Sequence, residues 1–98
     1  MLRRALLALG ALSLPAMARH SKTGFLSRSV FVRGEEYLYQ VFVPAHWTNQ
    51  QQWPVILFLH GSGERGSDGV AQAKIGLGAA IRQNPERFPA VVVMPQCR

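Results

Sequence analysis

The amino-acid sequence predicts an α/β fold in which an antiparallel β-hairpin is followed by a parallel βαβ unit. Two apolar runs, residues 55–59 and 90–94, show no polar alternation, which is typical of parallel strands whose two faces are both covered. Residues 70–83, between them, carry apolar residues at helical spacing. A strand, a helix and a second strand in this order form a right-handed crossover that places both strands parallel in one sheet.

The predicted hairpin comes first in the chain. Residues 26–32 and 37–43 are rich in β-branched and aromatic residues and are joined by residues 33–36, a link of the length that hairpins use. Alternate side chains of a strand share one face of the sheet. In the second run one face is expected to carry Tyr37, Tyr39, Val41 and Val43, and the other Leu38, Gln40 and Phe42.

The predicted helix carries two glycines, Gly76 and Gly78, which favour a split into two shorter pieces. Asn84 and Pro85 end the helix, and residues 86–89 form a connector. The second buried strand follows and is expected to end at Pro95. The predicted order is therefore hairpin, buried strand, glycine loop, helix and buried strand.

The amino terminus has the pattern of a secretory signal peptide. Arg3 and Arg4 give a positive start, residues 5–14 are apolar, and small residues precede a cleavage site after Ala18. The apolar run is shorter than the roughly 20 residues of a membrane span, so no stable membrane span is expected. We expect residues 1–18 to direct export to the periplasm or the extracellular space. Residues 19–24 then form a flexible leader, and residues 25–98 belong to a single domain.

Charge and cysteine content narrow the possible functions. The net charge is +6, but the basic residues beyond the signal are scattered singly, so no nucleic-acid-binding face is expected. Cys97 is the sole cysteine. In an oxidising compartment it is either a buried free thiol or half of a disulfide whose partner lies outside this sequence.

The glycine loop after the first buried strand has two interpretations. Residues 61–66 match G-x-G-x-x-G, the dinucleotide-binding fingerprint. However, loop residues follow Gly66 where a helix should begin, Glu64 and Asp68 place negative charge near a pyrophosphate, and residues 94–96 offer no carboxylate to a ribose. A Rossmann-like nucleotide-binding enzyme remains an alternative, with these glycines as its binding residues: Gly61, Gly63 and Gly66.

The second interpretation begins from residues 60–63, His-Gly-Ser-Gly. Glycines leave a backbone N–H open to a substrate, which a developing oxyanion requires. The motif L-H-G-S-G-E-R-G at residues 59–66, followed by N-P-E-R-F-P-A-V-V-V-M-P-Q-C at residues 84–97, resembles secreted esterases and predicted peptidases of the α/β-hydrolase superfamily. The similarity is to the polyhydroxybutyrate depolymerase and feruloyl esterase types and covers residues 37–98.

The resemblance implies a strand order of 1-2-4-3-5 and a role for the loop in catalysis. Ser62 would donate its backbone N–H to the oxyanion, Gly61 and Gly63 would shape the turn, and His60 would be structural. No G-x-S-x-G nucleophile elbow occurs in the sequence. We therefore expect residues 25–98 to be the amino-terminal part of an α/β-hydrolase domain, truncated before the elbow, so that nucleophile, acid and base are not in this chain.

The expected function is that of an exported serine hydrolase that cleaves an ester or peptide bond in a small-molecule or polymer substrate, without a metal or cofactor. A small noncatalytic secreted module is a further alternative, but parallel strands need helices on both faces and only one helix is available. The isolated chain is expected to lack activity and not to fold stably as a monomer, because residues 55–59 would leave a strand edge open.

Overall fold

The computed structural model describes residues 22–98. The predicted signal peptide, residues 1–18, and the first half of the predicted leader, residues 19–21, lie outside the described residues. None of the helices within residues 22–98 has the length and apolar character that crossing a membrane requires.

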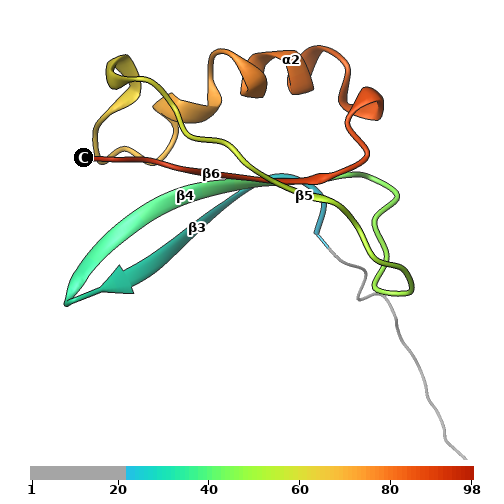
Figure 1. Ribbon diagram of the computed structural model, residues 1–98, viewed down its shortest axis with the longest axis horizontal. Coiled ribbons are helices and arrows are strands. Elements are labelled where there is room, and N and C mark those ends of the chain that lie inside the picture. Colours follow the sequence, from blue (N-terminus) through green and yellow to red (C-terminus); the bar gives the residue numbers. More distant parts are fainter. Residues whose placement is uncertain (1–21) are drawn as a thin grey trace, which may run out of the picture.

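Four strands form one mixed sheet in the order β3-β4-β6-β5 (Figure 1). β3 (Gly24–Val32) pairs antiparallel with β4 (Glu35–Val43), and β4 pairs antiparallel with β6 (Val91–Pro95). β6 pairs parallel with β5 (Val55–Leu57) on its other side. The hairpin and the parallel pair are confirmed, and the order agrees with the 1-2-4-3 arrangement that the resemblance implied.

The hairpin turn is tighter than predicted. Val32 pairs directly with Glu35, so only Arg33 and Gly34 connect the strands. Both residues have positive φ angles, 53° and 81°, as a type I′ turn requires. This turn suits the right-handed twist of the two strands, and it explains why Glu35 and Glu36 belong to β4 and not to the link.

Three helical pieces cover one face of the sheet (Figure 1). They are η2 (Ala71–Ala73), α2 (Leu77–Gln83) and η3 (Pro85–Arg87). The predicted split occurs at Gly76, which adopts a φ of 58° just before α2, whereas Gly78 lies inside α2 and does not interrupt it. A Cβ at Gly78 would overlap the carbonyl oxygen of Ala73, so the two pieces approach each other backbone to backbone.

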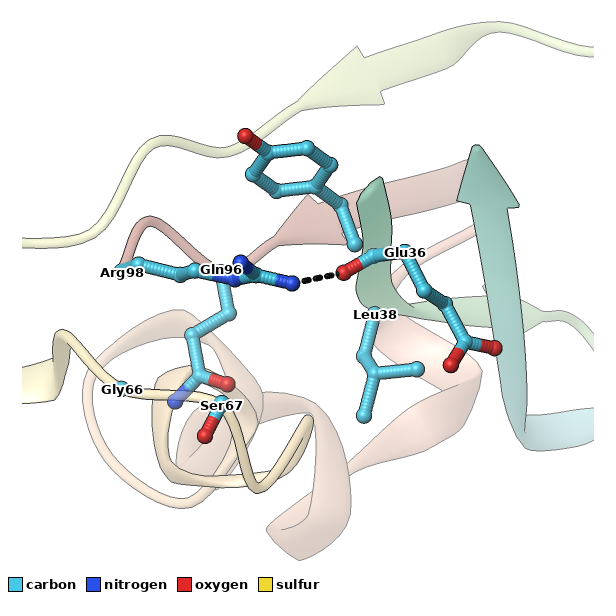
Figure 2. Close-up of a pocket in the computed structure, with 7 residues that line it drawn as sticks. Glu36, Leu38, Gly66, Ser67, Gln96 and Arg98 are labelled. Carbon is cyan, nitrogen blue, oxygen red and sulfur yellow. Dashed lines mark hydrogen bonds between the residues drawn. The ribbon is translucent and has the colours of Figure 1, made fainter. Parts of the chain in front are cut away.

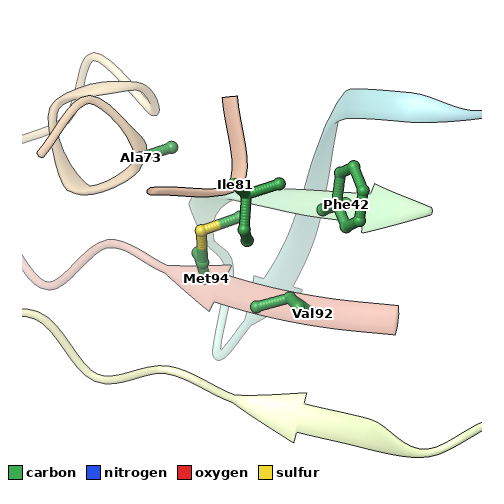
Figure 3. Close-up of a cluster of buried hydrophobic side chains, with 5 residues drawn as sticks. All are labelled: Phe42, Ala73, Ile81, Val92 and Met94. Atoms are coloured by element: carbon green, nitrogen blue, oxygen red, sulfur yellow. The ribbon is translucent and has the colours of Figure 1, made fainter. Parts of the chain in front are cut away.

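The hydrophobic core lies between this helical layer and the sheet (Figure 3). Phe42 of β4 and Val92 and Met94 of β6 face Ile81 of α2 and Ala73 of η2. Partly buried side chains extend the cluster: Phe25, Phe58, Leu77 and Phe88. The alternation predicted for the second hairpin strand holds at Phe42, which points into this core.

The prediction of a buried strand at residues 55–59 is wrong for the structure described. β5 is three residues long, and Val55, Leu57 and Leu59 are 67%, 62% and 72% exposed. The reason is position, because β5 lies at the edge of the sheet with β6 as its neighbour. Within residues 22–98 no strand pairs with its outer edge. β6, in contrast, is central, and its side chains are buried or half-buried.

Candidate functional site

The candidate site is the loop that leaves the carboxyl end of β5. The loop folds into a single 3₁₀ turn, η1 (Ser62–Glu64), preceded by Gly61. The Gly61 N–H donates to Oε1 of Glu64 at 3.1 Å, and the Glu64 N–H donates to the Gly61 carbonyl at 3.2 Å. These reciprocal bonds hold the turn closed. Ser62 is exposed, and as the first residue of the turn its N–H has no partner inside it.

His60 fastens the start of this loop to the segment after β6. Its Nε2 accepts the Cys97 N–H at 2.9 Å, and its Nδ1 lies 2.5 Å from the Gly61 carbonyl oxygen. The Gly66 N–H donates to the Cys97 carbonyl at 2.8 Å. Both ends of the turn are therefore attached to the same residue, Cys97, which lies two residues beyond the end of β6. Cys97 itself is exposed and is a free cysteine.

Gln96 attaches the middle of the loop to the sheet. This side chain is 4% exposed. Its Nε2 donates to the Glu64 carbonyl and to Oδ1 of Asp68, both at 3.0 Å, and its Oε1 accepts the Gly69 N–H at 2.7 Å. A buried carboxamide with three partners gives the loop a defined position relative to β6.

Asp68 ends the loop and begins η2. Its Oδ1 accepts the N–H groups of Val70 at 3.0 Å and Ala71 at 3.2 Å. These two backbone bonds, then the bond from Gln96 and the charge of Lys74, favour the ionised carboxylate, whereas partial desolvation opposes it; the pKa of Asp68 is lowered from its ordinary value of 3.8. The loop therefore carries a fixed negative charge near its end.

Two small cavities flank the loop. One, of about 190 Å³, is shown in Figure 2 between the loop and β4. The Arg98 guanidinium beside it donates to the Glu36 carbonyl and forms an ion pair with Glu35 at 2.7 Å, so its charge is already matched. The second cavity, also about 190 Å³, lies at the carboxyl ends of β5 and β6. Its lining residues are Leu59, His60, Pro95, Gln96 and Cys97.

The structure brings the predicted site residues Gly61, Ser62 and Gly63 together with His60 at the carboxyl end of the parallel strand pair. That edge is where open α/β sheets bind ligands.

The sequence interpretation missed Gln96 as the residue that anchors the loop. A glutamine directly after a strand carries no periodic or motif signal, because its role depends on a loop 27 to 32 residues earlier in the chain.

The geometry argues against the nucleotide-binding alternative. That fingerprint needs a helix N-terminus directly after the loop to face the pyrophosphate. Here the loop continues through Gly66 and Asp68 into a 3₁₀ turn, and α2 does not begin until Leu77.

Throughout residues 22–98, no three His, Cys, Asp or Glu side chains gather where they would hold a metal ion.

Comparison with known proteins relates this chain to a solved esterase. No family model matches the chain, and no curated protein matches it. Among solved structures, the chain is similar to a thermostable esterase, with a TM-score of 0.60 and 33% sequence identity. The match covers 74% of this chain and 21% of the esterase, so the chain spans about a fifth of that protein's length. This likeness supports the hydrolase superfamily and a partial α/β fold.

Proposed function

We propose that this chain is the amino-terminal part of an exported serine hydrolase that cleaves ester or peptide bonds by acyl transfer. In this proposal residues 60–66 supply part of the oxyanion hole. The observation that carries it is the exposed 3₁₀ turn beginning at Ser62, at the carboxyl end of β5. It occurs in a chain that is 33% identical, over the matched part, to a solved esterase.

The proposed chemistry of the loop is electrostatic. When a nucleophile attacks an ester carbonyl, the carbonyl oxygen becomes negative and is stabilised by N–H donors about 2.7 to 3.1 Å away. The Ser62 N–H is the first of a helical turn and so is free to donate outward. A Cβ at Gly63 would meet open space, so the glycine leaves the approach to the turn unobstructed. Because the turn is already closed by Glu64, no reorganisation is needed when charge develops.

The nucleophile and its base are proposed to come from outside these 98 residues. The Ser62 hydroxyl is a poor nucleophile candidate, since no G-x-S-x-G elbow surrounds it. His60 is a poor base candidate, because its Nε2 already accepts the Cys97 N–H. The substrate is a small-molecule or polymer ester, or a peptide, whose acyl and alcohol pockets involve further parts of the protein.

A fluorophosphonate probe tests this proposal. The full-length gene product and the isolated chain of residues 19–98 would both be treated with the probe and digested for peptide mapping. We expect the full-length product to hydrolyse a p-nitrophenyl ester and to be labelled at a serine outside residues 1–98. The isolated chain is expected to remain unlabelled. Labelling at Ser62 would assign the nucleophile to this chain, and an inert full-length product would exclude the serine hydrolase mechanism.

Export is a separate part of the proposal and rests on the pattern of residues 1–18. Amino-terminal sequencing of the protein recovered from the periplasm or the medium is expected to begin at Arg19. Recovery of a protein that retains Met1 from the cytosol would contradict export and leave the hydrolase proposal untouched.

A further inference from the structure

Three buried glutamine side chains from three separate parts of the chain bind the backbone of one glycine. Gln40 of β4, Gln72 of η2 and Gln96 after β6 are 5%, 0% and 4% exposed. Nε2 of Gln40 and Nε2 of Gln72 donate to the Gly69 carbonyl at 3.0 and 3.1 Å. Oε1 of Gln96 accepts the Gly69 N–H at 2.7 Å. Both backbone polar groups of Gly69, its N–H and its C=O, are therefore hydrogen-bonded by glutamine side chains.

The backbone at Gly69 also has no room to move toward β4. Its φ is 77°, in the left-handed region that favours glycine, and a Cβ there would lie 2.9 Å from the side chain of Leu38. Gln72 is held in turn, since its Nε2 also donates to the Met94 carbonyl in β6 at 3.0 Å. Buried carboxamides are costly unless they are hydrogen-bonded, and the amide nitrogens of all three glutamines donate to a partner, whereas Oε1 of Gln72 has none within residues 22–98. The bonds that are made hold Gly69 in one arrangement.

Gln96 connects the backbone of Gly69 to the glycine loop. The same carboxamide that holds Gly69 donates to the Glu64 carbonyl, at the end of η1. The backbone of Gln96 is itself attached to β4, since its N–H donates to the Leu38 carbonyl at 3.3 Å. One side chain therefore links the turn that begins at Ser62 to the rigid anchor at Gly69.

We propose that Gln96 is a positioning residue that sets the placement of the Ser62 turn relative to the sheet, with Gln40 and Gln72 fixing the Gly69 anchor that Gln96 uses. The inference of loop positioning stands on the contacts alone. Its consequence for catalysis rests on the proposed function of the loop. A donor held by the central strand keeps its direction while substrate and product exchange, which electrostatic catalysis requires.

The substitution Gln96→Glu is the sharpest probe because it replaces a hydrogen-bond donor with a charged acceptor and leaves the size of the side chain almost unchanged. The carboxylate still accepts the Gly69 N–H, but an oxygen replaces the donating amide nitrogen. That oxygen then faces the Glu64 carbonyl and the ionised Asp68 carboxylate, and both contacts become repulsive. The matched control is Gln83→Glu, the same chemical change at an exposed glutamine of α2.

The experiment measures amide hydrogen exchange in the full-length protein. We expect Gln96→Glu to raise exchange at residues 61–69 about tenfold or more, while the β3 and β4 amides and the Gln83→Glu control stay as in the wild type. The added change Asp68→Asn supplies an amide donor to the new carboxylate and is expected to restore much of the protection. Unchanged exchange at residues 61–69, or an equal rise throughout β3 and β4, would overturn the inference.

Two further measurements complete the test. Gln96→Met removes the three side-chain bonds without adding charge, and it is expected to give the same localised rise in exchange if Gln96→Glu does not fold. In ester hydrolysis, Gln96→Glu is expected to lower kcat about tenfold or more with little change in KM. If the wild type shows no hydrolysis but the exchange result holds, the proposed function fails and loop positioning stands. If hydrolysis occurs but the exchange result fails, the inference of loop positioning is overturned and the proposed function stands.

Discussion

The backbone N–H of Cys97 donates a hydrogen bond to Nε2 of His60, with a nitrogen-to-nitrogen distance of 2.9 Å. The two residues are 37 positions apart in the sequence. The accepting nitrogen carries no proton, so the ring proton is assigned to Nδ1, which faces the Gly61 carbonyl. Both ring nitrogens are therefore occupied by backbone groups. His60 therefore links the segments that follow β5 and β6.

Substitutions at Ser62 distinguish a backbone role from a side-chain role. Ser62→Ala keeps the N–H, and we expect ester hydrolysis by the full-length protein to remain within a few-fold of wild type. Ser62→Pro removes the donor and is expected to lower kcat about 100-fold or more. Equal losses in both variants would assign the role to the hydroxyl. Circular dichroism of both variants controls for folding.

Gly69 and Gly34 form a matched pair for measuring the cost of crowding at the anchor. Their φ angles are 77° and 81°, but a Cβ at Gly34 meets open space whereas one at Gly69 meets Leu38. We expect Gly34→Ala to lower the free energy of unfolding by about 1 to 2 kcal/mol, from backbone strain alone. Gly69→Ala is expected to lower it by about 2 to 5 kcal/mol, because overpacking is added. Equal costs in chemical denaturation would show that the Leu38 contact is easily relieved.

The pKa of Asp68 depends on the hydrogen bonds that the carboxylate accepts at the end of the loop. Hydrogen bonds from Val70, Ala71 and Gln96 hold it below 3.8. A pKa lowered by folding means that the ionised group stabilises the fold above about pH 3.8, and that this stabilisation is lost as pH falls through the lower, folded value. A ¹³C titration of the carboxyl group should therefore show a midpoint below that of the same residue in the urea-unfolded chain. A folded midpoint at or above 3.8 would contradict the described contacts.

The two outer strands of the sheet differ in how well they resist self-association. β3 carries Arg28, whereas β5 consists of three uncharged residues, Val55–Leu57, with Leu57 62% exposed. Charges on edge strands suppress edge-to-edge pairing. We expect residues 19–98 alone to associate in sedimentation velocity as concentration rises, and Leu57→Lys to shift the distribution toward monomer. Phe31→Lys, at a side chain that is 69% exposed on β3, is the matched control and is expected to change little.

The elements predicted best are those whose signals are local. The hairpin follows from alternating β-formers, and the split helix follows from Gly76, which begins α2 with a positive φ. The tighter turn was missed because Arg33 is not a residue type that usually signals a positive φ. In each case the information needed lies within a few residues of the element.

Features that depend on distant partners were predicted less well. The apolar run at β5 is the same signal as that of β6, but burial depends on neighbours, and β5 lies at the edge of the described sheet. The loop itself was located from its glycines. The side chains that hold it, Gln72 and Gln96, were not, since hydrogen bonds that span 22 to 32 residues leave no pattern in one sequence.

The central place of β6 has a consequence for synthesis on the ribosome. β6 is the last strand of the four to be made, yet it lies between β4 and β5. The chain emerges at about 5 to 20 residues per second, so the β3–β4 hairpin can close from local contacts while β5 still waits for its partner. During that interval the nascent chain exposes two unpaired strand edges that belong to one sheet. These two edges stay unpaired at least until residues 91–95 leave the exit tunnel.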